Sequence, residues 1–119
     1  MKNRKNHKVE FKDNPDGGVI ATFSHCDVVQ SDIEDLLGMD GVAGFLFYVT
    51  RFKRVDFEIL SRFKEVRKLA FLYCNLTDTE LAQLEKVNSI KFVQFHDTSL
   101  TPAAIDKYAE NNPRVTVYV

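Results

Sequence analysis

The sequence has no tryptophan, two cysteines among 119 residues and no long run of apolar residues. No segment approaches the roughly 20 consecutive apolar residues that a membrane-spanning helix needs. The basic segment at residues 1–8 is not followed by the hydrophobic stretch of a secretory signal. We therefore expect a cytoplasmic protein in which Cys26 and Cys74 are free thiols, because disulfides form mainly in oxidising compartments.

A surplus of charge is also missing, since 16 Lys and Arg residues oppose 17 Asp and Glu residues. A chain with this balance has no overall attraction for nucleic acid or anionic lipid. Apolar residues, by contrast, make up 45% of the chain and include ten phenylalanines, which is typical of a globular protein with an aromatic core. The chain is long enough to bury that core as one domain without disulfides or metals.

Apolar residues recur at an interval of 24 residues. The series from Phe23 continues through Phe47, Phe71 and Phe95 to Val119, and the series from Ala21 continues through Phe45, Leu69 and Val93 to Val117. A fixed period of this size is typical of stacked repeat units. Within each unit, alternating apolar residues predict a strand, and apolar residues three apart predict a helix or tight helical turns. Such units stack into a short right-handed solenoid, with parallel strands on one face and helices on the other.

The pattern is strongest in the stretches VRKLAFLYCNLTDTELAQL and IKFVQFHDTSLTPAAIDKY. Their spacing resembles the leucine-rich repeat, L-x-x-L-x-L-x-x-N/C/T-x-L, and in particular its compact bacterial variants. Phe and Val often replace Leu here, and the resemblance covers about residues 18–119. It implies an α/β solenoid and a role in protein recognition, because most members of the family are protein-recognition scaffolds.

We expect the solenoid to begin with a capping hairpin. In HKVEFKDNPDGGVIATFS, two alternating stretches flank strong turn residues, which predicts an antiparallel pair of strands. A capping box from Thr77, and Thr101 followed by Pro102, predict helix starts in the third and fourth units. The predicted division is a disordered basic tail at 1–6, a single domain at 7–119 with a cap strand and turn at 7–17, repeats at 18–41, 42–65, 66–89 and 90–113, and a final strand at 114–119.

The polar residues do not predict an enzyme, a cofactor or a metal site. Cys26 and Cys74 fall two strands apart, a separation of about 10 Å, whereas a disulfide needs less than about 7 Å between its Cα atoms. His25 and His96 fall three strands apart, about 14 Å. His96 with Asp97 is the closest approach to an acid–base pair, and we interpret both as surface residues at a strand end.

The open face of the sheet is the best candidate for a binding site. Residues between the buried strand positions point to this face, and its middle is apolar and aromatic. A contiguous patch of this kind usually marks a partner site. The predicted partner-binding residues are Leu46, Tyr48, Val49, Leu72, Tyr73, Phe92, His96 and Tyr118.

The main hypothesis is a non-enzymatic module that binds another protein, rather than nucleic acid or a membrane, through this face. An inhibitor or immunity-type protein is a narrower form of it. Two alternatives stay open: a homodimer through the same face or the C-terminal strand edge, and an N-terminal arm that folds across the sheet. The face measures roughly 300–400 Å², and a standard interface takes about 800 Å² per partner, so flanking loops must contribute or the binding is weak.

Overall fold

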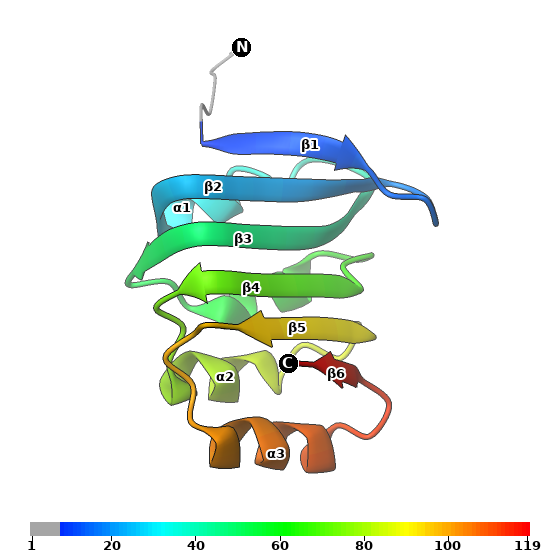
Figure 1. Ribbon diagram of the computed structural model, residues 1–119. Helices are drawn as coiled ribbons and strands as arrows, with labels where there is room; N and C mark the ends of the chain where they lie inside the picture. The colour runs from blue at the N-terminus through cyan, green and yellow to red at the C-terminus, as the bar shows by residue number, and fades with distance from the viewer. Residues whose placement is uncertain (1–7) are drawn as a thin grey trace.

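The computed structural model describes residues 8–119, so the predicted tail at 1–6 lies outside the described residues. One layer is a six-stranded sheet in which the strands follow their order in the chain (Figure 1). β1 is antiparallel to β2, and all later neighbours are parallel. The strands are β1 (Val9–Asp13), β2 (Val19–Val29), β3 (Val42–Lys53), β4 (Lys68–Cys74), β5 (Phe92–His96) and β6 (Thr116–Tyr118).

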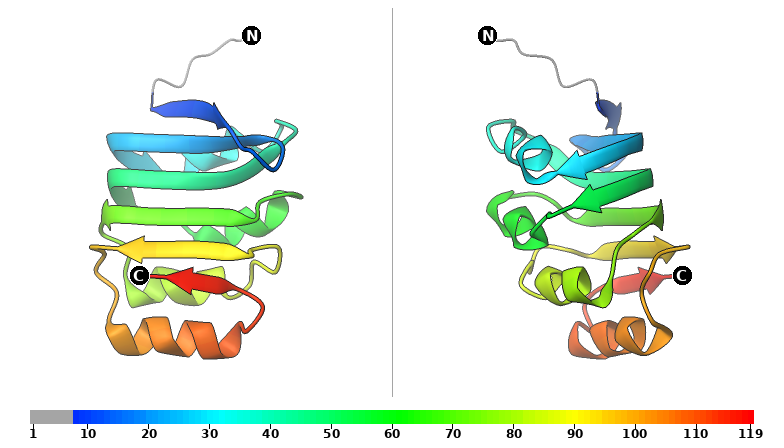
Figure 2. Two further views of the ribbon diagram at one scale, coloured as in Figure 1. Left: turned by 45° about the vertical axis from the view of Figure 1, so that its right-hand side comes forward. Right: turned by 90° about the vertical axis from the view of Figure 1, so that its left-hand side faces the viewer.

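The second layer is helical. Its elements are α1 (Gln30–Glu34), the 3₁₀ helix η1 (Phe57–Arg62), α2 (Asp78–Leu84) and α3 (Pro102–Asn111). All of them lie on the same side of the sheet, so within residues 8–119 the opposite face carries no helix (Figure 2). The fold is therefore mixed α/β, as predicted, and each predicted repeat contains one strand followed by one helical element.

The parallel strands pair at the 24-residue interval. Phe47 lies opposite Phe23 on β2 and Phe71 on β4, and Phe71 lies opposite Phe95 on β5. The four rings form one buried stack, with successive centroids 5.5, 5.3 and 5.9 Å apart and nearly parallel planes. The four phenylalanines of this series are therefore the centre of the core, whereas the last member of the series, Val119, is 81% exposed.

The predicted hairpin caps the first unit. β1 pairs antiparallel with β2, with Val9 opposite Phe23. Gly18, in the turn between them, has a φ of +76°, and a Cβ there would collide with the carbonyl oxygen of Gly41. Glycine is favoured at this position because it alone meets both conditions without strain.

Side chains also link each unit to the next. The Phe52 backbone N–H donates to Asn75 Oδ1 (2.7 Å), and Asn75 Nδ2 donates to the Phe52 carbonyl (3.2 Å). Asp78 accepts from both the backbone N–H and the hydroxyl of Thr101, each at 3.0 Å. These bonds satisfy polar groups where the chain leaves a strand, so they stabilise the contact between units as well as the local turn.

The predicted helix starts are confirmed. Thr77 and Glu80 form a capping box at α2, in which Glu80 Oε1 accepts from the Thr77 backbone N–H at 2.8 Å. Thr101 caps α3 by accepting from the Ala104 N–H, with Pro102 in the first turn. At the start of each of these two helices, the cap thus satisfies backbone N–H groups that have no partner within the helix.

Candidate partner-binding surface

The backbone at the open face departs from a regular strand at one repeated position. His25, Val49, Tyr73 and Asp97, which are spaced 24 residues apart, have φ values of 54°, 52°, 57° and 51°. This left-handed conformation costs a residue with a side chain about 1–2 kcal/mol, and it is most unusual for a β-branched residue such as Val49.

The repeated left-handed residue changes which side chains face outward. In a regular strand successive side chains alternate between faces. Here Tyr48 and Val49 are both exposed and Thr50 is buried, and likewise Leu72 and Tyr73 face outward before the buried Cys74. The departure therefore places two adjacent side chains of each strand on the open face. Backbone strain of this kind is concentrated at functional sites.

Relief of this strain should stabilise the fold. We expect Val49→Asn to raise the free energy of unfolding by about 1 kcal/mol, because Asn tolerates the left-handed region far better than Val. Val49 is 37% exposed, so the apolar burial lost with Asn offsets only part of the strain that is relieved. Urea denaturation measures the change. The same substitution at Val117, which is half-buried in β6, should lower stability instead, and a loss at both positions would contradict the argument.

Four aromatic side chains form a continuous row across β2 to β5. The ring centroids are 5.4 Å apart for His25 and Tyr48, 5.8 Å for Tyr48 and Tyr73, and 5.2 Å for Tyr73 and His96. Each pair meets edge to face, with planes 85–89° apart. We call these four residues the aromatic row. Edge-to-face pairs contribute about 0.5–1.5 kcal/mol beyond area burial, so each ring helps to hold its neighbour in place.

Beside the aromatic row the face is hollowed above Ala70, whose small side chain leaves room between larger neighbours. The hollow has a volume of about 430 Å³. Phe92 and Tyr118 on its rim are 41% and 52% exposed. Its apolar lining on the open face comes from Ile20, Leu46, Ala70, Leu72, Phe92 and Tyr118. We call it the Ala70 hollow.

The structure brings the predicted site residues together on this face. Tyr48, Tyr73 and His96 belong to the aromatic row; Leu46, Leu72, Phe92 and Tyr118 line the Ala70 hollow; and Val49 lies against His25 and Tyr73 at the strand ends. Among residues 8–119, eight large apolar side chains are exposed, and Tyr48, Val49, Tyr73, Phe92 and Tyr118 supply five of them. This concentration, rather than any single exposed residue, marks the surface.

Two details differ from the sequence interpretation. Thr22 lies between the buried strand positions Ala21 and Phe23, which predicts a place on the open face, but it is only 5% exposed, and its hydroxyl has no hydrogen-bond partner in the part of the chain that the structure describes. Thr22 is flanked on both sides, by Glu10 on β1 and Leu46 on β3. Although His96 was among the predicted partner-binding residues, His25 was not. Its 24-residue register with Val49 and Tyr73 was the available signal.

Neither the two cysteine thiols nor the His96–Asp97 pair is activated for catalysis. Burial raises the pKa of Cys74 to about 11 and also raises the pKa of Cys26, so both thiols are protonated at neutral pH. A nucleophilic cysteine needs the opposite shift. His96 Nε2 and Asp97 Oδ2 are 3.7 Å apart, too far for a hydrogen bond, and both side chains are more than half exposed. In residues 8–119, no three His, Cys, Asp or Glu side chains group as metal ligands would.

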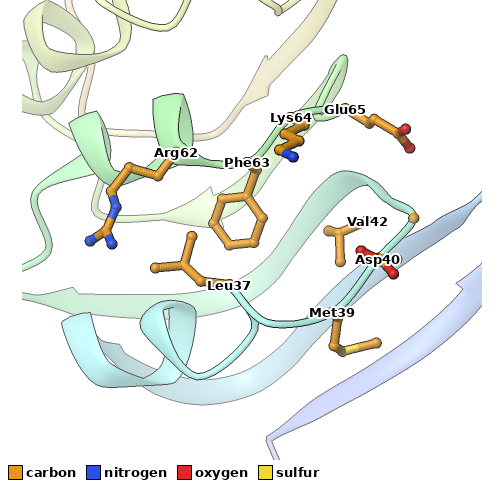
Figure 3. A pocket seen from close by; sticks show the side chains of 9 residues that line it. Leu37, Met39, Asp40, Val42, Arg62, Phe63, Lys64 and Glu65 are labelled. Carbon is orange, nitrogen blue, oxygen red and sulfur yellow. The ribbon is translucent and has the colours of Figure 1, made fainter.

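A different hollow, of about 410 Å³, lies among the loops that follow α1 and η1. Leu37 and Phe63 face each other across it, with charged side chains along its margin (Figure 3). Those charged residues are Asp40, Arg62, Lys64 and Glu65. Because both signs are equally represented, the hollow indicates no ligand class.

Two further observations complete the description. None of the helices formed by residues 8–119 has the length and apolar character needed to cross a membrane. The sequence matches no family model and no curated protein.

Proposed function

We propose that this protein is a non-enzymatic module of the leucine-rich-repeat type that binds a partner protein in the cytoplasm through the open face of its sheet. The main support is the aromatic row, in which two of the four rings, His25 and Tyr73, belong to residues in the left-handed conformation. The solenoid interpretation is supported by parallel strands paired at 24-residue intervals and by helices on one side only.

The chemistry of the face suits protein recognition. Tyrosine provides a large contact area with few rotatable bonds, so little conformational entropy is lost when it is covered. Tyr48 and Tyr73 already constrain each other, which lowers that cost further. Aromatic residues are enriched at the centres of protein interfaces and among the side chains that dominate binding energy.

Leu72→Glu should reduce recovery of the partner from native lysate by at least about tenfold, because a buried unpaired carboxylate at the interface costs more than 1.4 kcal/mol. Leu72 lies between Tyr48 and His96 in the strand register. Quantitative mass spectrometry of proteins captured by immobilised wild type and variant measures the change. Lys107→Glu, at an exposed position of α3 in the helical layer, is the control and should capture normally.

The outcome depends on the variant remaining folded. Far-UV circular dichroism and thermal unfolding should match the wild type, since Leu72 is only half-buried. If a folded Leu72→Glu variant captures the same proteins in the same amounts as the wild type, the open face is not the binding surface. If the captured protein is an enzyme that loses activity on binding, the narrower inhibitor or immunity-type function is indicated.

Self-association is the second candidate. Among the described strands, β6 pairs only with β5, and Tyr118 and Val119 at this end are 52% and 81% exposed. An open edge of this kind can pair with a strand of a second copy. Sedimentation equilibrium decides: a monomer at the highest concentration measured excludes this alternative. A dimer that persists in Leu72→Glu supports pairing at the β6 edge, and a dimer that Leu72→Glu disrupts supports pairing through the open face.

A further inference from the structure

The Ala70 hollow adjoins a basic region. This region lies at the edge of the sheet where β2 to β6 begin, an edge that can be followed in Figure 1. A second hollow of about 380 Å³ lies at this edge and shares Asn14, Lys68 and Phe92 with the Ala70 hollow. Three cationic side chains line it: Arg67, Lys68 and Lys91. We call this region the basic margin.

Lys68 stands at the junction of the two hollows and is fixed there. Its ammonium group donates to Asn14 Oδ1 (3.0 Å) and to Asp16 Oδ2 (3.2 Å), both in the turn between β1 and β2. An ammonium group has three donors, so one stays available to a ligand. Although Lys68 is paired, it therefore presents a hydrogen-bond donor at a defined position beside the apolar hollow.

The other two cations make the margin positive. Arg67 and Lys91 are exposed immediately before the neighbouring strands β4 and β5, and neither side chain has an ion pair or a hydrogen bond within residues 8–119. The anions that also line the margin are Asp16, which pairs with Lys68, and Glu65. Three cations thus face two anions, which leaves the margin with one net positive charge to complement an acidic group.

The small area of the open face limits which partner can bind there. A second copy of the chain would meet a sheet surface of roughly 300–400 Å², about half of what each partner contributes to a standard interface. A single segment that inserts a side chain into the hollow uses this small area better, because deep desolvated pockets provide most of the binding energy in protein interfaces.

We propose that the Ala70 hollow and the basic margin together bind a segment of the partner protein in which a large apolar side chain stands within two residues of an Asp or Glu. The apolar side chain enters the hollow between Leu46, Leu72 and Phe92, and the carboxylate meets Lys68, Arg67 and Lys91. This inference rests on the proposed function and specifies the chemistry of the partner.

Titration of isotope-labelled protein with blocked tripeptides tests the proposal directly. Acetyl-Phe-Ala-Asp-amide should produce saturable NMR shifts at Ala70, Phe92 and Tyr118, with a Kd on the order of 1 mM. Acetyl-Phe-Ala-Asn-amide should bind about three- to fivefold more weakly, as expected for loss of one exposed charge pair. Acetyl-Ala-Ala-Asp-amide should give no saturable shift, because nothing fills the hollow.

Protein variants separate the two parts of the site. Ala70→Leu fills the hollow and should weaken binding of the Phe-Ala-Asp peptide at least fivefold. Lys91→Glu should weaken that peptide but favour acetyl-Phe-Ala-Lys-amide, whereas Lys107→Glu on α3 makes the same charge change and should alter neither. Equal affinities for the Asp and Asn peptides, or shifts that do not saturate, would overturn the proposal.

The outcomes also distinguish this proposal from the proposed function. If partner capture from lysate is lost with Leu72→Glu but unaffected by Ala70→Leu and Lys91→Glu, the inference fails and the binding function stands. If capture does not depend on Leu72 while the tripeptides still bind as expected, the proposed function fails, and the Ala70 hollow and the basic margin are a peptide-binding site that takes no part in capture. Concentration-dependent shifts of the same amides without peptide would show a second copy in the site and overturn the proposal.

Discussion

Phe47→Ala should lower the free energy of unfolding by about 3–5 kcal/mol, more than any other change considered. The ring is fully buried and stacks between Phe23 and Phe71, with centroid distances of 5.5 and 5.3 Å. It also meets the edges of Phe52 and Phe57, at 5.0 and 6.1 Å. The cavity left by the missing Phe47 ring would be enclosed by packed rings along the stack and beneath it. The surrounding side chains therefore could not readily move in to fill it.

Urea denaturation followed by far-UV circular dichroism measures the loss, with the slope of the transition checked against the wild type. Phe11→Ala is the matched control, because Phe11 is 43% exposed on the edge strand β1 and should cost under about 1 kcal/mol. Should Phe47→Ala fail to fold, Phe47→Leu gives a measurable loss of about 1–2 kcal/mol. A cost at Phe47 no greater than at Phe11 would contradict the central role of the stack.

The stack shows why so much of this fold could be predicted from the sequence. Residues at the same position of successive units pack on one another, so an apolar residue in one unit requires an apolar residue 24 positions later. Phe23, Phe47, Phe71 and Phe95 record that requirement without a single insertion, and the strand pairing follows it. The hairpin was predictable for a separate, local reason, because Gly17 and Gly18 allow the turn.

The left-handed residues could not be predicted, because their side chains together give no clear sign of them. Glycine and asparagine are the strongest signals of this conformation. Asp97 and His25 are of types that adopt it more often than most, but Val49 and Tyr73 are not, so the repeated position could not be recognised. The local cost is outweighed by burial of neighbouring core residues, which single-residue preferences do not contain. The sequence also does not decide between a 3₁₀ helix and an α-helix for η1, because apolar residues three apart, such as Phe57 and Leu60, suit both.

The outward direction of several candidate residues could be predicted, but the geometry of their contacts could not. Register alone assigns Leu46, Tyr48 and Leu72 to the open face, and the structure places them there. The edge-to-face contacts of the aromatic row depend on side-chain rotamers and on the left-handed backbone, neither of which a repeat pattern specifies. The basic margin depends on the turn between β1 and β2 reaching Lys68, a contact across 52 residues of sequence.

Asn75→Ala is expected to lower the free energy of unfolding by about 2 kcal/mol, because one side chain satisfies two backbone groups of Phe52. The Phe52 N–H donates to Asn75 Oδ1 at 2.7 Å, and Asn75 Nδ2 donates to the Phe52 carbonyl at 3.2 Å. Both bonds are partly buried, so water replaces them incompletely. They also join two successive units just where β3 ends, so their loss weakens the contact between the units.

Two comparisons give this prediction its test. Gln83→Ala removes one bond, to the Phe57 N–H, and should cost about 1 kcal/mol. Asn88→Ala removes an exposed contact with Arg114 and should stay within about 0.5 kcal/mol. Hydrogen exchange provides the local readout: Asn75→Ala should accelerate exchange of the Phe52 amide about tenfold more than that of the Phe57 amide, equivalent to about 1.4 kcal/mol. Equal acceleration at both amides would mean that Asn75 stabilises the domain as a whole and not the junction between its units.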